Sequence, residues 1–373
     1  EEIIALVALF RPGPLQSGMV DDFIVRKRGE AEIHYPHPGL EAILKPPYGV
    51  ILYQEQVMQI ARVLAGYTLG AADLLRRAMG KKKPKEMARQ RKFFVSGAIE
   101  RGVEEKIATS IFDLMEKFAG YGFNKSHSAA YALLAYQTAW LKAHHPAAYM
   151  AAVLSTDMDH TDKIVNLIDE CKRMGLTIRP PHVNHSDYSF LVEDKTTVRY
   201  GLGAIKGLGH SAVEAFVKER EANGHYRSLA DLCVRADKDR LNRKAYEALI
   251  ESGALDGLAE HRAQLMGRLP DAIAAAEQRQ RAGEAGQVDL FGVSAAVARE
   301  VESALSRWDE HERLAREKAT LGLYLSGHPI DRYRALVPQL GAERIADLVG
   351  ELPSMGAPPP RNVRVLALVL ELR

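Results

Sequence analysis

The sequence predicts a mainly α-helical protein with more than one domain. Its length of 373 residues is enough for roughly two or three domains. Apolar residues recur at helical spacing, as at Val57, Ile60, Ala61 and Leu64, where positions i, i+3, i+4 and i+7 share one face of a helix. A hydrophobic content of 47% and a charged content of 26% are typical of a globular protein.

The chain up to about residue 185 is predicted to be mostly helical. Arg11-Pro12-Gly13-Pro14 predicts a rigid turn. Helices are expected over residues 53–65, over 73–79 with Gly80 as the stop, and from Pro84 to about residue 100.

An alanine-rich helix is expected next. Ser126 or Ser128 can cap its start, and it runs to about Lys142. Because this segment is apolar nearly all round, we expect it to be buried. Pro146 then opens another helix.

The pattern changes after Pro180. Thr197-Val198-Arg199-Tyr200 predicts a short strand, and helices are expected over about residues 211–222 and 241–252. Residues 277–303 are rich in Ala, Gly, Gln, Glu and Arg, which predicts a mobile linker.

The last part is mixed. Residues 304–352 are predicted to be helical at first. Pro358-Pro359-Pro360 then precedes residues 363–370, whose apolar, β-branched composition predicts a strand.

Several classes of protein are excluded. No apolar run reaches the length of about 18 residues that a membrane span needs, and no signal peptide is present. Cys171 and Cys233 are far apart, which suits a reducing cytoplasm and argues against a zinc cluster. The chain begins at Glu1 inside a structured-looking run, so we expect an internal fragment of a longer protein.

Positive charge is concentrated in one segment. The chain has a formal net charge of only +2, yet between residues 76 and 92 Glu86 is the one acidic residue. The basic residues there are Arg76, Arg77, Lys81, Lys82, Lys83, Lys85, Arg89, Arg91 and Lys92. Such a cluster attracts phosphate, although a solvated helix end is the alternative interpretation.

A second segment, Gly120 to Ser128, strengthens the first interpretation. It reads Gly-Tyr-Gly-Phe-Asn-Lys-Ser-His-Ser and lacks the spacing of a P-loop. Together the two segments predict a site for polyphosphate and nucleic acid.

Ile205-Lys206-Gly207-Leu208-Gly209 has the form of a helix-hairpin-helix turn. Its glycines let the backbone turn tightly and approach a ligand, the following helix N-terminus presents amides to phosphate, and Lys206 adds charge. Residues 249–256 look like a degenerate second copy; such pairs bind duplex backbone without reading sequence. The alternative is a plain glycine-rich turn.

Gln287-Val288-Asp289-Leu290-Phe291 lies in the polar linker. Two adjacent apolar anchors there suit a groove on a partner protein. Packing of Leu290 and Phe291 back onto their own domain is an equally good interpretation.

No metal site is predicted. Asp157 and Asp159 have the spacing of a metal-binding pair, but no third carboxylate is placed by a recognisable strand. His182 and His185 lie in a proline-flanked loop, where histidines are more often unliganded.

Long motifs show a resemblance to a known family. They are residues 9–15 (Leu-Phe-Arg-Pro-Gly-Pro-Leu), 52–58 (Leu-Tyr-Gln-Glu-Gln-Val-Met), 74–83, 118–131 and 321–329 (Leu-Gly-Leu-Tyr-Leu-Ser-Gly-His-Pro). Over essentially its whole length the chain resembles the alpha subunit of bacterial replicative DNA polymerase III, a family C polymerase.

The resemblance implies a domain order. Residues 1–185 would be the fingers domain, 186–292 the clamp-binding domain with tandem helix-hairpin-helix, 293–360 a connecting segment, and 361–373 the first strand of a truncated OB-fold. The family's PHP domain and its palm, which carries the metal-binding aspartates, would precede Glu1. No catalytic residue is therefore expected in this chain, and the fragment alone is expected to be inactive.

The resemblance also implies residue roles and partners. Arg76, Arg77, Asn124, Lys125, Ser126 and His127 would contact the incoming nucleotide; Lys81, Lys82, Lys83, Lys206, Gly207 and Gly209 would contact DNA; Gln287, Asp289, Leu290 and Phe291 would bind the sliding clamp, the beta subunit. Primer-template DNA, deoxynucleoside triphosphates and other holoenzyme subunits are the further partners, in the cytoplasm, with magnesium in the full-length enzyme. A stand-alone DNA- and clamp-binding module, or a structural scaffold, are the alternatives.

Overall fold

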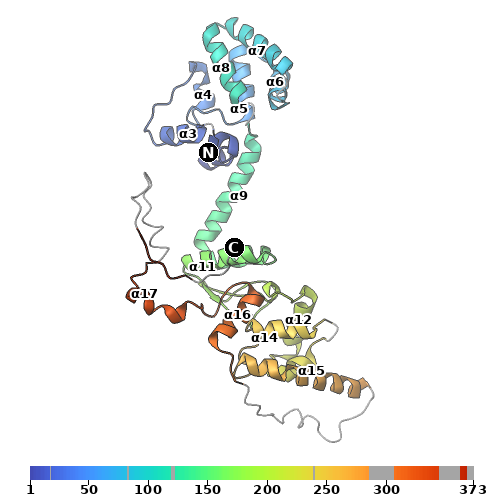
Figure 1. Cartoon of the computed structure of the whole chain (residues 1–373). Helices are drawn as coiled ribbons and strands as arrows, with labels where there is room; N and C mark the ends of the chain where they lie inside the picture. Colours follow the sequence, from blue (N-terminus) through green and yellow to red (C-terminus); the bar gives the residue numbers. More distant parts are fainter. Residues whose placement is uncertain are drawn as a thin grey trace. The chain divides into compact units, whose positions relative to one another are not determined.

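The computed structural model describes residues 1–16, 18–81, 84–118, 122–237, 240–284, 306–343 and 362–367. The chain divides into two compact units, Glu1–Leu141 and Lys142–Arg373 (Figure 1). Each unit has its own hydrophobic core. Helices dominate both units, which confirms the predicted fold class. No helix in the described ranges is long and apolar enough to cross a membrane.

The first unit is built mainly of helices. Its elements are α1 (Glu2–Leu9), α2 (Pro12–Gln16), α3 (Met19–Lys27), η1 (Pro38–Leu40), α4 (Glu41–Leu44), α5 (Gln54–Ala65), α6 (Leu69–Lys81), α7 (Pro84–Ile99), α8 (Glu105–Phe118) and most of α9 (Lys125–His144). Helices α5, α6, α7 and α8 contact one another around Ile60, Phe94 and Phe112, none of which is exposed. The predicted starts at residue 53 and Pro84 are confirmed to within one residue.

The second unit adds a small sheet to its helices. Its elements are α10 (Pro146–Thr156), α11 (Thr161–Arg173), β1 (Thr177–Arg179), β2 (Leu191–Val192), β3 (Thr197–Arg199), η2 (Leu202–Ala204), α12 (His210–Asn223), α13 (Leu229–Arg235), α14 (Arg243–Glu251), α15 (Arg262–Glu284), α16 (Glu310–Leu321), η4 (Asp331–Tyr333) and α17 (Leu336–Gln339). The predicted strand and the helices near 211–222 and 241–252 are confirmed.

The sheet has the order β1-β3-β2. Strand β1 runs parallel to β3, with Ile178 opposite Val198, and β2 is antiparallel to β3. Val198 is fully buried in the core of the second unit. The sheet thus anchors the chain directly before the glycine-rich segment at residues 201–209.

Helix α6 is longer than the sequence predicted. It begins at Leu69, because the Thr68 hydroxyl accepts a hydrogen bond from Ala71 N at 3.2 Å and so caps the first turn. The prediction that Gly80 ends the helix is wrong, since α6 continues to Lys81. A glycine ends a helix only where the backbone turns left-handed, and Gly80 has no positive φ.

The prediction for α9 is wrong in two respects. The cap is Asn124: its Oδ1 accepts from His127 N at 2.9 Å and its carbonyl accepts from Ser128 N. Of the helix only Ser128 and Ala132 are buried, whereas the large side chains of Tyr131, Leu134 and Tyr136 are more than half exposed. An apolar composition permits burial but does not supply a packing partner.

Three other segments differ from the prediction. Pro12 starts the short helix α2 instead of a turn, since proline suits a first helical position. Residues 277–284 continue α15 instead of a linker, because Ala, Gln, Glu and Arg are strong helix formers. In the described residues 362–367 no strand forms; Arg364 O accepts one bond from Glu343 N.

Candidate functional site

The side chain of Gln54 connects the two segments that the sequence singled out. Its Oε1 accepts from Arg76 Nη1 at 3.2 Å, and its Nε2 donates to the carbonyl of Gly122 at 3.0 Å. Its backbone N–H donates to Phe123 O at 2.9 Å. The basic helix α6 and the segment before α9 are thus held beside the start of α5, in one unit.

Asp73 orients both arginines of α6. Arg76 Nη2 lies 2.7 Å and Arg77 Nε 2.8 Å from the Asp73 carboxylate. Hydrogen bonding from Arg76, with the charges of both arginines, holds the pKa of Asp73 below its ordinary value. The Arg76 side chain is 33% exposed and that of Arg77 63%, so Arg77 presents more of its guanidinium to a ligand.

The start of α9 is fixed by a carboxylate. Lys125 N donates to both oxygens of Glu55, at 3.1 and 3.0 Å, which places negative charge at a helix N-terminus. The Lys125 ammonium lies 3.3 Å from Glu1 Oε2 and 5.6 Å from the centre of the Tyr53 ring. Lys125 therefore has a fixed position, whereas Ser126 and His127 are exposed.

Aromatic rings stand beside this helix start. His127 packs against Phe123 and Tyr131, with ring centroids 5.2 and 4.6 Å apart, and the Arg11 guanidinium lies 4.6 Å from the centre of the Phe123 ring. Gln54, Glu55 and Arg11 were not predicted as site residues. They all lie in motifs that carried the family resemblance, which was the signal available.

The basic cluster is only partly free of carboxylates. Arg91 is paired with Asp113 and with Glu116, the latter at 2.8 Å, and its guanidinium also covers the Phe112 ring. Lys85, Arg89 and Lys92 are exposed. Lys81 is the last residue of α6, and Lys82 and Lys83 lie outside the described residues.

The first glycine turn of the second unit is open to solvent. Lys206, Gly207 and Gly209 are all exposed. Gly207 has φ +90°. Gly209 directly precedes α12, so the amides of the first turn of that helix follow it. Lys206 N donates to the carbonyl of Thr320 at 3.0 Å, which fixes the turn to α16.

The second glycine turn is closed. Gly253 has φ +84° but is buried, because the Arg262 guanidinium lies over it. Arg262 pairs with Asp256 at 2.8 Å and with Glu317 at 3.2 Å, and it donates to Glu251 O at 3.0 Å. The Arg262 guanidinium therefore covers this turn.

Neither a metal centre nor the clamp motif is found in the described structure. Within the described ranges, no three His, Cys, Asp or Glu side chains are grouped as a metal would require. Cys171 and Cys233 are buried and free, and burial raises the pKa of each thiol to about 11. Gln287, Asp289, Leu290 and Phe291 lie outside the described residues.

Two family models match separate parts of the chain. The model of the bacterial DNA polymerase III alpha subunit finger domain matches residues 1–102, and a helix-hairpin-helix model matches residues 175–265. The DNA polymerase III alpha subunit of Escherichia coli K12 is 56% identical over 93% of this chain, and that of Pseudomonas aeruginosa is 53% identical over all of it. The chain belongs to the bacterial DNA polymerase III alpha subunit family.

Only part of such a subunit is represented. The chain spans 31% of the length of the Escherichia coli alpha subunit and 33% of that of Pseudomonas aeruginosa. The finger-domain match includes Gln54, Arg76 and Arg77, and the helix-hairpin-helix match includes both glycine turns. The Asn124–His127 segment lies between the two matched regions.

Proposed function

We propose that this chain acts in DNA replication as the part of a DNA polymerase alpha subunit that positions the incoming deoxynucleoside triphosphate and the primer-template. The observation that carries the proposal is the bridge made by Gln54 between Arg76 and Gly122. It brings Arg76, in the region that matches a polymerase finger domain, close to Gly122, which comes shortly before the Asn124–His127 segment.

The arginines suit the phosphates of the nucleotide. A guanidinium binds phosphate oxygens through two parallel N–H groups, and phosphoryl transfer needs such cations to hold developing charge. Arg77, the more exposed of the two, makes the first contact, and Arg76 is kept in place by Asp73 and Gln54. Asn124, Lys125, Ser126 and His127 form the wall beside the nucleotide.

The metal chemistry belongs to the rest of the enzyme. Magnesium would bring the triphosphate and the attacking hydroxyl together in the full-length polymerase. In this proposal the metal ligands and the catalytic residues belong to the rest of the polymerase; the described residues contain no group of three His, Cys, Asp or Glu side chains that could hold a metal.

The second unit contacts duplex DNA and the clamp in this proposal. Lys206, Gly207 and Gly209 bind the duplex backbone. In the first unit, Lys81, Lys82 and Lys83 follow the template or primer strand. The sliding clamp is bound by Gln287, Asp289, Leu290 and Phe291. This assignment rests on the sequence motif. The clamp proposal predicts binding that is lost in the double variant Leu290→Ala, Phe291→Ala.

The domain boundaries are part of the same proposal. We assign residues 1–185 to the fingers, 186–292 to clamp and duplex binding, 293–360 to a connection, and 361–373 to the start of an OB-fold. Other holoenzyme subunits are the expected partners and the cytoplasm the expected compartment.

The nucleotide site is tested by Arg77→Ala in the full-length enzyme, with Arg28→Ala as the matched loss of an exposed arginine in the same unit. We expect Arg77→Ala to lower kcat/KM for the nucleotide at least ~10-fold, and Arg77→Lys to restore part of it. Unchanged steady-state and single-turnover kinetics in Arg77→Ala would remove this residue from the site.

The exposed first turn also favours a second candidate, a DNA- and clamp-binding module without catalysis. That candidate predicts that the whole protein binds duplex DNA and clamp but does not bind nucleotide. If nucleotide protects the site in the unchanged protein and this protection is lost in Arg77→Ala, the result supports the polymerase.

A further inference from the structure

The carboxylate of Asp73 lies between the two arginines of α6, and each of its oxygens pairs with a different guanidinium. Arg76 donates from Nε and Nη2 to Asp73 Oδ1, at 2.9 and 2.7 Å. Arg77 Nε lies 2.8 Å from the other oxygen, Oδ2. A phosphate group binds a guanidinium through the same kind of N–H···O contact. The carboxylate therefore occupies donor groups that a phosphate also needs.

The two arginines are not held equally firmly. Arg76 is 33% exposed and also donates from Nη1 to Gln54 Oε1 at 3.2 Å, so it is held from two sides. Arg77 is 63% exposed, and among the described residues Asp73 is the only carboxylate that pairs with it. An ion pair this exposed contributes little free energy. A phosphate can therefore displace the carboxylate from Arg77 while Arg76 keeps its position.

A displaced Asp73 carboxylate stays close to Arg77. The two residues are four positions apart on α6, and side chains at this spacing are neighbours on a helix. A ligand on the same chain has a high effective concentration, because it does not have to diffuse to its site. Hydrogen bonding from Arg76, with the charges of both arginines, holds the pKa of Asp73 below its ordinary value. Asp73 is therefore ionised at neutral pH and able to pair with Arg77 again.

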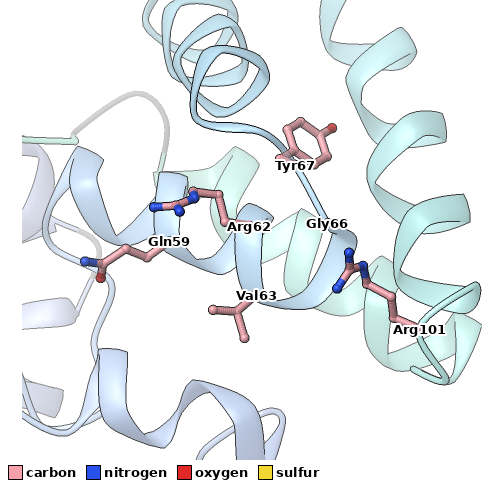
Figure 2. Close-up of a pocket in the computed structure, with 6 residues that line it drawn as sticks. All are labelled: Gln59, Arg62, Val63, Gly66, Tyr67 and Arg101. Atoms are coloured by element: carbon pink, nitrogen blue, oxygen red, sulfur yellow. The ribbon is translucent and has the colours of Figure 1, made fainter.

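Two other arginines of the same unit have surroundings without carboxylates. Arg62 and Arg101 are exposed and line a shallow hollow at the end of α5, where Figure 2 shows them on either side of Val63. Among the described residues that line this hollow, none is acidic. A phosphate that bound to any exposed arginine would therefore meet less competition there than at Arg77. Arg62 is thus a matched control for Arg77.

We propose that Asp73 is an internal competitor for phosphate at Arg77, which limits the affinity of this site for polyphosphate and so promotes the departure of pyrophosphate. The inference rests on the proposed role of Arg77 in nucleotide binding. A bound triphosphate takes the Arg77 guanidinium from Asp73 Oδ2, and the carboxylate pairs with Arg77 again when pyrophosphate, the product of chain extension, leaves. Arg76 stays on Oδ1 throughout. Asp73 acts through the arginines and is not a catalytic residue.

The test is the affinity of the full-length enzyme for pyrophosphate, measured by calorimetric titration and as the inhibition constant in primer extension. Asp73→Asn removes the charge of the competitor but keeps an oxygen that can accept from Arg76. We expect both constants to fall about 2- to 5-fold, the range for loss of an exposed ion pair. Asp22→Asn, which removes an exposed carboxylate paired with Arg26 in the same unit, is expected to change neither. Constants that stay the same or rise in Asp73→Asn, as a purely orienting role would give, overturn the proposal.

Three further variants separate this inference from the nucleotide site on which it rests. Arg77→Ala is expected to weaken pyrophosphate binding, and Arg62→Ala to leave it unchanged. The double variant Asp73→Asn, Arg77→Ala should bind pyrophosphate no more tightly than Arg77→Ala, because the competition acts through Arg77.

Each contrary result has its own meaning. If Arg77→Ala binds pyrophosphate as the unchanged enzyme does, or if Arg62→Ala loses as much affinity, the proposed nucleotide site fails and this inference fails with it. If Arg77→Ala weakens binding but Asp73→Asn still tightens it in the double variant, the nucleotide site stands and competition at Arg77 is overturned.

Discussion

The two glycine turns of the second unit have nearly the same φ at their glycine and opposite surroundings. Gly207 and Gly253 have φ of +90° and +84°. Around Gly207 the nearest atom to an added Cβ is Ala248 Cβ at 3.9 Å, and the turn is exposed. Gly253 is buried beneath Arg262, which pairs with Asp256 and Glu317. A glycine with positive φ therefore predicts that the chain turns there, but not whether the turn is exposed or buried.

Helix α16 contributes to both outcomes. Glu317 on α16 holds the cation that closes the second turn, and the carbonyl of Thr320, one turn later, holds Lys206 at the first. Glu317 also accepts from Ser326 N at 2.8 Å and Leu325 N at 2.7 Å. Helix α16 thus holds the open turn in place and also holds the arginine that covers the closed turn.

The largest effect is expected from breaking the closed turn at Glu317. Glu317 is 1% and the Arg262 side chain 7% exposed, so Glu317→Ala removes one of the two carboxylates that pair with a buried cation, and with it the acceptor of Leu325 N and Ser326 N. We expect a loss of about 3–5 kcal/mol in the free energy of unfolding, measured by denaturant titration. Glu312→Ala, which breaks an exposed pair with Arg316 on the same helix, should cost under about 1 kcal/mol. Equal effects of the two changes would show that the buried pair is not structural.

Gly253→Ala should come next in size. The added Cβ meets Arg262 Cζ at 2.7 Å and the φ is unfavourable for alanine, so both strain and displacement oppose it. These terms sum to roughly 2–4 kcal/mol in unfolding free energy. The double variant Gly253→Ala, Arg262→Ala is compared with Arg262→Ala alone. The loss of unfolding free energy caused by the added methyl group should then be smaller. If the methyl group costs as much free energy without the Arg262 side chain, the whole cost comes from the unfavourable φ.

A pH dependence should appear beside the closed turn. Burial, helped by the charge of His185, lowers the pKa of His182 to about 4, and Val183 N donates to Ala254 O at 2.8 Å next to it. Because the folded pKa is below the unfolded value near 6.5, the contribution to stability is complete above pH 6.5 and is lost as the pH falls toward 4. Chemical denaturation across this window checks it. A His182→Gln variant with the same pH slope would contradict this assignment.

The smallest stability effect is expected at the open turn. Gly207→Ala has space for the methyl group, so only the left-handed φ should cost free energy, about 1–2 kcal/mol. Thermal unfolding of Gly207→Ala and Gly253→Ala side by side measures the contrast. A larger cost at Gly207 would reverse the comparison.

Local sequence signals predicted the elements well and their contacts poorly. The spacing of Val57, Ile60 and Leu64 located α5 to within one residue, and Pro84 located α7. The start of α6 was missed because the Thr68 cap was overlooked, and α9 was wrongly expected to be buried because composition does not reveal a partner. Local chemistry was thus enough for elements with a clear period and cap.

The candidate site depended on contacts that no local pattern contains. The family resemblance supplied Arg76, Arg77 and the Asn124–His127 segment, but their meeting at Gln54 joins residues far apart in the sequence. Likewise, Gly253 and Gly207 look alike in sequence, and only the position of Arg262 separates them. The roles of these residues remain predictions.

The measurement that tests the comparison most directly is the salt dependence of duplex DNA binding by the full chain. Lys206 at the open turn and Lys244, an exposed lysine on α14 before the closed turn, are each changed to alanine. If the open turn binds the duplex backbone, Lys206→Ala should reduce the salt slope by about 0.9 and Lys244→Ala should leave it unchanged. A slope that Lys206→Ala does not alter, or that both changes reduce equally, would contradict the assignment of duplex binding to the open turn.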